Sequence, residues 1–531
     1  MANEEIKEYI SSLAPAATYD ETGEWLNILV EPIALKPLMA DLRTGKMQMN
    51  YLFCVTCVDF KTHLTMVYHL SATTHRQSIV IKSNLNRDTP VIETVCAIWR
   101  TAEFLEREVF EMFGVNFTNH PDLRKLILED DFKGFPLRKD FEDPINMINY
   151  NWRMYNQTEI IKDTSELGAD GELVINMGPQ HPATHGVLHL VVTLNGETIK
   201  KIEPHLGFIH RSIEKMCESL TYRQFIYVTS RMDYLSSHIN NLGCALLVEK
   251  GMQIEVPDRA KYIRVILSEL TRIASHELWL GAMAMDLGAF TPFFYAFRER
   301  EMITDIMEDT CGARLTMNYI VPGGLMYDLH PDFQKKVKAF ITQFKSKVTE
   351  YEDLVTNNII FQSRTKGVGI LSAEDAISYG CTGPVARASG VSCDIRKIYP
   401  YEVYDKVEFD EVIETAGDSF ARYIVRVKEM NQSIRIIEQL IDNIPEGDFV
   451  GKTKNVLKLP KGEFYSRVET ARGEFGVYVV SEGGTTPHRI KFRSPGFSNL
   501  SVLNHIAAGG MIGDLMASMG TLDLVIPDID R

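Results

Sequence analysis

The residues from Leu278 to Phe297, LWLGAMAMDLGAFTPFFYAF, form an apolar stretch about as long as a bilayer span. Asp286 lies at its centre and Pro292 lies near its end. A carboxylate in the middle of a membrane is costly, so we favour a buried core helix over a transmembrane helix. The preceding segment has apolar residues at helical spacing, at Tyr262, Ile266, Leu270 and Ile273. We therefore expect a chain that does not cross a membrane.

The composition is that of a globular protein with two or three domains. The chain has 531 residues, of which 45% are hydrophobic and 24% charged, and its net charge is −15. This acidic balance disfavours a nucleic-acid-binding protein, which normally presents a basic face. The opening residues MANEEIKEYISSLAPAA are acidic and amphipathic, unlike a secretory signal. Eight cysteines in so long a chain indicate a reducing compartment rather than a disulfide framework.

The first 142 residues predict an α/β domain. Four short runs, LNILVE, YLFCVTCVDF, LTMVYHL and QSIVIK, are rich in β-branched and aromatic residues and predict an antiparallel sheet. A helix is expected from Val91 to Phe113, capped by Thr89 and ended by Gly114. The irregular composition of residues 143–171 predicts a linker.

Residues 172–531 predict a mainly helical domain with β elements. Helical stripes run from Asp332 to Asn358 and from Ser419 to Asn443. Two strands are expected on either side of the loop PQHPATH, residues 179–185. Near the end, GVYVV and HRIKFR flank SEGGTTP, which predicts a hairpin with a long turn. The overall expectation is an α+β protein.

Two cysteines, Cys54 and Cys57, form the one Cys-x-x-Cys pair in the sequence. They lie in an expected strand, where residues three apart face opposite sides of the sheet. A lone pair also cannot complete a tetrahedral metal site. We interpret them as structural thiols and expect no iron–sulfur cluster in this chain.

Residues 106–140, EREVFEMFGVNFTNHPDLRKLILEDDFKGFPLRKD, alternate acids and bases around an expected helix end. Such a pattern is most often a solvated surface of ion pairs, which we favour here over a catalytic site.

The loop NMGPQHPATHGVL, residues 176–188, places His181 and His185 four residues apart. A metal site would need further ligands, and the sequence offers none nearby. A hydrogen-bonding or proton-transferring role is therefore favoured, because neutral imidazole both donates and accepts protons near pH 7. From the residues alone, Asp286 is equally consistent with a functional acid and with a helix-packing acid bonded to the backbone or to an arginine.

These motifs resemble two subunits of respiratory complex I, the NADH–quinone oxidoreductase. Residues 106–140 resemble the signature of its C subunit, where the segment packs against neighbouring subunits. The loop 176–188 resembles the hallmark of its D subunit. The D resemblance continues through these segments: HLGFIHRSIEK (205–215), RMDYLS (231–236), DLGAFTPFFYAFRERE (286–301), RKIYPYEVYD (396–405), GDSFARYIVRVKEMNQS (417–433) and RVETARGEFGVYVVSEGG (467–484). The order, C then D, is that of the fused forms.

The resemblance implies a quinone site. In the D subunit the residue matching Tyr234 binds the quinone headgroup, and the aspartate matching Asp286 hydrogen-bonds the histidine matching His185. Arg211 matches an arginine beside the terminal cluster of the neighbouring small subunit. His210 and His181, close to these residues, are assigned to binding as well.

The resemblance also implies partners and a location. We expect no cofactor bound in this chain, quinone as substrate, and a terminal iron–sulfur cluster on the adjacent B subunit. Partners would be the B, H and I subunits at the cytoplasmic face of the inner membrane, with membrane contact only through the complex. The alternative is a non-catalytic scaffold in a related ferredoxin- or hydrogenase-linked membrane complex.

The same family descends from the large subunits of nickel–iron hydrogenases, which hold their metals with two Cys-x-x-Cys pairs. The matching positions here are Asp233, Ser236, Val525 and Asp528. Without the thiolates, that nickel site cannot form. One further departure is Thr316, where many family members have a histidine linked to the pH dependence of the terminal cluster. The resemblance therefore does not predict that coupling for this chain.

Overall fold

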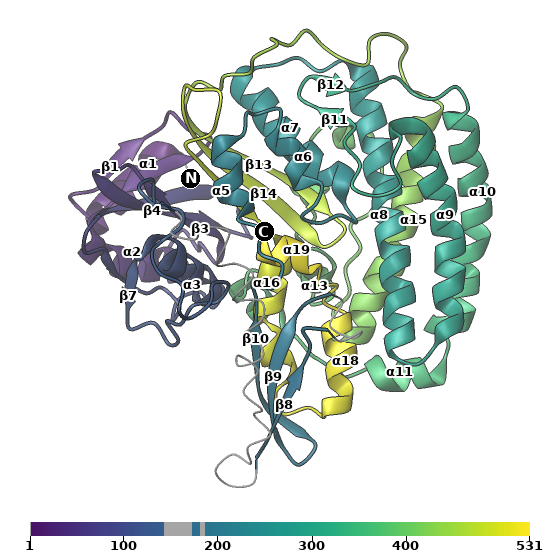
Figure 1. The fold of residues 1–531 in the computed structure, drawn as a ribbon, viewed down its shortest axis with the longest axis horizontal. Helices are drawn as coiled ribbons and strands as arrows, with labels where there is room; N and C mark the ends of the chain where they lie inside the picture. Colours follow the sequence, from purple (N-terminus) through teal and green to yellow (C-terminus); the bar gives the residue numbers. More distant parts are fainter. Residues whose placement is uncertain (1, 143–171, 181–185) are drawn as a thin grey trace.

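The computed structural model describes residues 2–142, 172–180 and 186–531. The expected linker 143–171 and both loop histidines, His181 and His185, lie outside the described residues. In Figure 1 the N-terminal unit lies on one side, a bundle of long helices lies on the other, and a sheet lies between them. The predicted α+β class is confirmed.

The N-terminal unit is built on a five-stranded sheet with the order β1-β2-β5-β4-β3. Its strands are β1 (Thr18–Asp20), β2 (Leu26–Leu29), β3 (Tyr51–Asp59), β4 (His63–Ser71) and β5 (Ser78–Asn86), accompanied by helices α1 (Asn3–Leu13) and α2 (Pro32–Thr44). The expected antiparallel pairing holds except between β2 and β5, which are parallel. The helix α2 follows β2, so no hairpin joins β2 to β5 and a parallel pairing is possible.

The helix predicted over residues 91–113 is wrong in its first half. Val91–Glu93 is strand β6, which pairs in parallel with β7 (Asn116–Thr118), and helix α3 spans only Ala102–Phe113. Ile92 and Val95 are buried, so the apolar spacing marked burial correctly without marking a helix. The β-branched Val91 and Ile92 suit the strand. Gly114 ends α3 as expected, in the left-handed conformation with φ 76°.

A three-stranded sheet occupies the middle of the molecule (Figure 1). It consists of β13 (Lys461–Thr470), β14 (Gly473–Glu482) and β15 (Arg489–Arg493). β14 and β15 are antiparallel, which confirms the predicted hairpin. Tyr465 and Tyr478 of this sheet pack with Phe53, Val58 and Val80 of the N-terminal sheet in one hydrophobic cluster. The two halves of the chain are therefore joined through a packed core.

Four long helices form the bundle that lies beside this sheet (Figure 1). They are α8 (Asp258–Asp286), α9 (Phe290–Cys311), α10 (Phe333–Tyr351), which continues as a π-helix over Glu352–Thr356, and α15 (Ser419–Ile441). The predicted stripes over residues 332–358 and 419–443 are confirmed by α10 and α15. Asp418 caps α15 by accepting the N–H of Ala421.

The apolar stretch from Leu278 to Phe297 is not one core helix. It is the end of α8, a turn at Gly288 with φ 89°, and the start of α9. Asp286 is therefore the last residue of α8, half-buried, and does not interrupt a helix. Over the described ranges, no helix combines the length and apolar character that a bilayer span requires.

A second three-stranded sheet, β10-β9-β8, lies below the central sheet in Figure 1. Its strands are β8 (Leu173–Met177), β9 (His189–Asn195) and β10 (Thr198–His205), and β8 and β9 are the strands predicted on either side of the loop 179–185. The remaining elements are short apart from α7: α5 (Ile213–Ser219), α6 (Phe225–Thr229), α7 (Ser237–Met252), β11 (Ile320–Val321), β12 (Gly324–Leu325), α11 (Ile359–Thr365), α12 (Ala373–Ser378), α13 (Gly383–Arg387), α14 (Ile395–Ile398), a 3-10 turn (Tyr404–Lys406), α16 (Pro495–Ser501), α17 (Leu503–Ala507), α18 (Ile512–Gly520) and α19 (Ile526–Asp530).

Candidate quinone site

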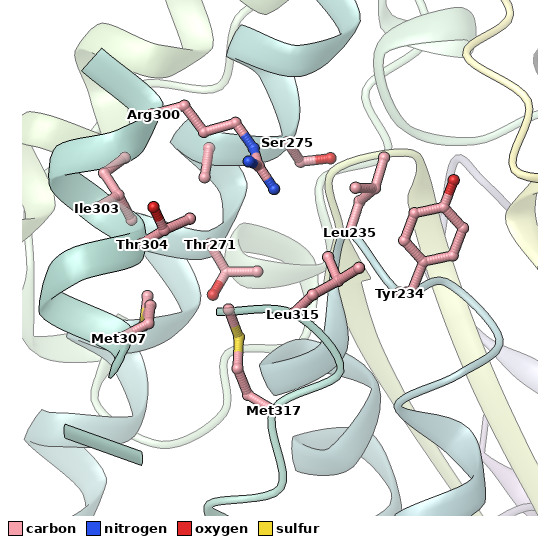
Figure 2. A pocket seen from close by; sticks show the side chains of 11 residues that line it. Tyr234, Leu235, Thr271, Ser275, Arg300, Ile303, Thr304, Met307, Leu315 and Met317 are labelled. Atoms are coloured by element: carbon pink, nitrogen blue, oxygen red, sulfur yellow. The ribbon is translucent and has the colours of Figure 1, made fainter. Parts of the chain in front are cut away.

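A small cavity lies between the turn that precedes α7 and the helices α8 and α9 (Figure 2). Its volume is about 20 Å³, which is room for about one water molecule. Arg300 points into it from α9, and Tyr234 lies at its edge beyond Leu235. The lining residues are Tyr234, Leu235, Thr271, Ala274, Ser275, Arg300, Ile303, Thr304, Met307, Leu315 and Met317.

Tyr234 is half-buried at this edge. Burial raises the pKa of its hydroxyl above the usual 10.0. The negative charges of Asp233 and Asp523 add to this increase, whereas the positive charges of Arg472 and Arg300 act in the opposite direction. The hydroxyl is therefore protonated at neutral pH and is a hydrogen-bond donor. Two arginines and two carboxylates thus act on this hydroxyl, and both carboxylates pair with Arg472.

Arg472 is the centre of a fully buried polar cluster next to Tyr234. Its guanidinium lies 3.0 Å from Asp233 Oδ2 and 3.2 Å from Asp523 Oδ1. It also donates to Ser275 Oγ at 3.0 Å and to Ser236 Oγ at 3.4 Å. Two of the four positions that match hydrogenase thiolates, Asp233 and Ser236, thus bind a guanidinium.

The other two positions lie at the C-terminal end of the chain. Val525 is buried in the core. Asp528 is buried and accepts a hydrogen bond from Ser494. Burial, together with the charge of Asp233, raises the pKa of Asp528 to about 6. This donor set of two carboxylates, a hydroxyl and an alkyl side chain has no soft ligand for nickel.

Asp286 ends α8 beside α18. A Cβ on Gly520 would stand 3.8 Å from Asp286 Oδ2. The indole of Trp279, two turns earlier on α8, donates to the carbonyl of Gly520 at 2.7 Å. The Asp286 carboxylate therefore lies close to Gly520, the last residue of α18. Its expected partner, His185, lies outside the described residues, so the predicted pair stays a prediction.

His210 and Arg211 lie away from the cavity that Tyr234 borders. His210 Nδ1 donates to the carbonyl of Asp530 at 2.6 Å and borders a second small cavity, which Glu108 also lines. Arg211 is exposed and donates to the carbonyl of Arg231 at 3.0 Å. Arg231 begins the segment that carries Tyr234, so Arg211 is tied to the backbone leading into the site.

The charges of α3 are buried, which corrects the interpretation of residues 106–140 for the helix. After the helix, Asp122 and Arg124 form a partly exposed ion pair, as expected for a surface. Glu106, Glu108 and Glu111 are all buried. Glu111 accepts the backbone N–H groups of Leu126, Ile127 and Leu128. The spacing of charges along the helix did not show this, because burial depends on residues 126–128 folding back onto α3 and on β15, which comes from a distant part of the sequence.

Cys54 and Cys57 belong to separate hydrophobic clusters, so they face opposite sides of β3 as predicted. Burial raises the pKa of the Cys54 thiol to about 12.

One group of potential metal ligands was not evident from the sequence. The ligand atoms of Cys96, Glu106 and His120 lie within 4.8 Å of one another. His120 Nδ1 accepts the N–H of Asp122, so Nε2 carries the proton and donates to the carbonyl of Glu103. That tautomer leaves no free nitrogen lone pair for a metal.

Comparison with known proteins decides the family. The family model of the respiratory-chain NADH dehydrogenase 30 Kd subunit matches residues 28–144, and that of the 49 Kd subunit matches 286–458 and 452–531. The NADH-quinone oxidoreductase C/D subunit of Bacteroides fragilis is 49% identical over 531 residues, 94% of this chain and 99% of that protein. The chain belongs to the NADH-quinone oxidoreductase C/D family.

Other relatives agree with this assignment. The C/D subunit of Bacteroides thetaiotaomicron is 48% identical over 94% of this chain and 99% of its own length. The D 2 subunit of Solibacter usitatus is 49% identical over 68% of this chain and 97% of its own length. The resemblance to a fusion of the C and D subunits is therefore confirmed. As a member of this family, the chain works with other subunits of the oxidoreductase.

The backbone at Thr316 is unusual for a threonine. Thr316 lies between Leu315 and Met317, which both line the cavity, and has φ 49°. A β-branched residue rarely adopts this left-handed conformation, whereas histidine and asparagine adopt it more readily. Arg300 and Arg472 were missed from the sequence, because only the fold brings helix α9 and the turn between β13 and β14 close to Tyr234.

Proposed function

We propose that this chain forms the pocket in which a NADH-quinone oxidoreductase complex reduces quinone. Electrons would come from a terminal iron–sulfur cluster on the adjacent B subunit. The observation that carries the proposal is the position of Tyr234, a protonated donor at the edge of a cavity into which Arg300 points.

Reduction places negative charge on the carbonyl oxygens of quinone. Donors and cations already positioned at those oxygens stabilise this charge, and protonated donors pass on protons. Tyr234 would donate at one carbonyl. His185, oriented by Asp286, would donate at the other. The cavity is smaller than a quinone ring, so we place the headgroup against Tyr234 at the cavity edge.

The assembly implied by this role has the B, H and I subunits as neighbours and holds the chain at the cytoplasmic face of the membrane. Protein groups in this chain would supply binding, protons and electrostatic stabilisation. The complex would couple the reaction to proton translocation.

A photoreactive quinone tests the location of the site directly. In the assembled complex, illumination is expected to label peptides that contain Tyr234 or residues 311–324, and an excess of unmodified quinone is expected to abolish the labelling. Labelling confined to other subunits would contradict the proposal and favour a scaffold role for this chain.

A further inference from the structure

A second acidic residue, Glu277, lies two residues after Ser275, which lines the same cavity from α8. Glu277 is on α8 and is fully buried. Among the described residues, neither of its carboxylate oxygens has a hydrogen-bond partner. The Nε of Arg300, which points into the cavity from α9, is likewise buried and without a partner within the described part of the chain. A buried acceptor and a buried donor are thus both left unpaired. Each unpaired group costs free energy, so its presence calls for a functional explanation.

The packing of α8 on α9 brings these two residues to the same level. Gly281 of α8 lies against Phe293 and Ala296 of α9. The two helices form an antiparallel hairpin. The residue one turn before Gly281 on α8 therefore lies opposite the residue one turn after Ala296 on α9. That step leads to Glu277 on one helix and to Arg300 on the other.

The groups that face Glu277 are few. The charges of Glu299 and Arg300 on α9 act on Glu277. The charge of Glu277 acts in turn on the hydroxyl of Tyr351 on α10. Glu299 is already engaged, since it accepts from Tyr351 at 2.7 Å and from Arg298 at 2.6 Å. On the α15 side, Glu429 is bonded to His276. Arg300 is therefore the one cation that acts on Glu277 among the described residues.

Burial and the charge of Glu299 hold the pKa of Glu277 well above its usual 4.5, while Arg300 acts in the opposite direction. An ionised carboxylate at this position would need the guanidinium as its partner, because an unpaired buried charge is strongly unfavourable.

We propose that Glu277 is a proton-holding positioning residue for quinone reduction, which controls how much of the charge of Arg300 reaches the cavity edge at Tyr234. This inference rests on the proposed function. With Glu277 neutral, the guanidinium faces the cavity and stabilises negative charge on the reduced quinone. When Glu277 loses its proton to water, the carboxylate pairs with Arg300 and cancels most of that field.

The variant Glu277→Gln fixes the neutral state at nearly the same shape. In the assembled complex, wild-type quinone reduction is expected to slow as pH rises and Glu277 ionises. Glu277→Gln is expected to keep the low-pH rate and to exceed the wild-type rate by about tenfold at high pH. An infrared pH titration of the resting complex should show a carboxylic-acid carbonyl band that Glu277→Gln lacks. Glu374→Gln, on an exposed glutamate of α12, is the matched control and should titrate as the wild type does.

Arg300→Gln provides a second variant. It is expected to lower quinone turnover at every pH and to remove the Glu277-dependent decline. A Glu277→Gln complex with the wild-type pH profile and infrared band would overturn the inference, and so would an Arg300→Gln complex with the wild-type rate and profile. If Tyr234→Phe lowers turnover while both variants behave as wild type, this inference alone fails. If Tyr234→Phe also leaves turnover unchanged, the proposed function fails with it.

Discussion

The ammonium of Lys491 on β15 lies 2.6 Å from both carboxylate oxygens of Glu108 on α3. Both side chains are buried. Arg531 approaches the same carboxylate at 2.5 Å, and Glu214 lies 3.5 Å from Lys491. This cluster joins the part of the chain that matches the 30 Kd family model to the part that matches the 49 Kd model. Its charges compensate one another in a region without solvent.

Removal of Glu108 is expected to destabilise the whole chain. Glu108→Ala leaves Lys491 and Arg531 buried with Glu214 as their remaining acidic partner, which should lower the free energy of unfolding by about 3–5 kcal/mol. Urea unfolding of the full chain measures this. Glu93→Ala, which removes a partly exposed pair with Lys36, is the control and should cost at most about 1 kcal/mol. A similar small cost for both variants would show that the cluster does not hold the two parts together.

Thr316→Asn is expected to stabilise the chain. Asparagine tolerates the left-handed conformation that Thr316 adopts, so the free energy of unfolding should rise by about 1 kcal/mol. The same substitution at Thr342, in the exposed part of helix α10, should have no stabilising effect because its backbone is helical. Equal effects at the two positions would rule out strain at Thr316.

The sequence predicted those parts of the fold in which the spacing of apolar residues follows from the backbone conformation itself. Helices α10 and α15 and the β14–β15 hairpin followed from such spacing. The spacing of Ile92, Val95 and Trp99 predicted a helix wrongly. These buried residues lie in strand β6 and in the turn that follows it. A periodic burial pattern reports which residues face the core and does not by itself report the backbone conformation.

For the site, the sequence identified Tyr234 through resemblance, whereas its electrostatic surroundings required the fold. Arg300 comes from α9 and Arg472 from the turn between β13 and β14, so no local motif links them to Tyr234. Glu108 was interpreted as exposed because a helix with alternating charges usually is. Its partner Lys491 lies 383 residues away in the sequence.

The isolated chain is expected to bind no redox metal. Asp233 already bonds Arg472, and the other matching positions are Ser236, Val525 and Asp528. Elemental analysis of the purified chain should find nickel and iron well below one atom per molecule. Stoichiometric nickel or iron would contradict this expectation.

Arg211→Met is expected to lower the reduction potential of the neighbouring cluster. A fixed positive charge near a cluster favours its reduced, more negative state, so removing the charge favours the oxidised state. A potentiometric EPR titration of the assembled complex measures the shift. Arg223→Met, on another arginine that donates hydrogen bonds within the same part of the chain, is the control. If Arg211→Met shows the wild-type potential and signal, Arg211 does not lie beside the cluster.

The central claim is that Tyr234 donates to quinone, and Tyr234→Phe tests it most directly. The variant removes only the hydroxyl, so the ring still fills the cavity edge and assembly should survive. Losing one such donor should cost about 1–3 kcal/mol, so steady-state quinone turnover should fall about tenfold or more while the clusters still reduce. His185→Ala should lower turnover too, and Asp286→Asn should resemble it because Asp286 acts through the imidazole. Wild-type turnover and quinone affinity in fully assembled Tyr234→Phe and His185→Ala complexes would contradict the account.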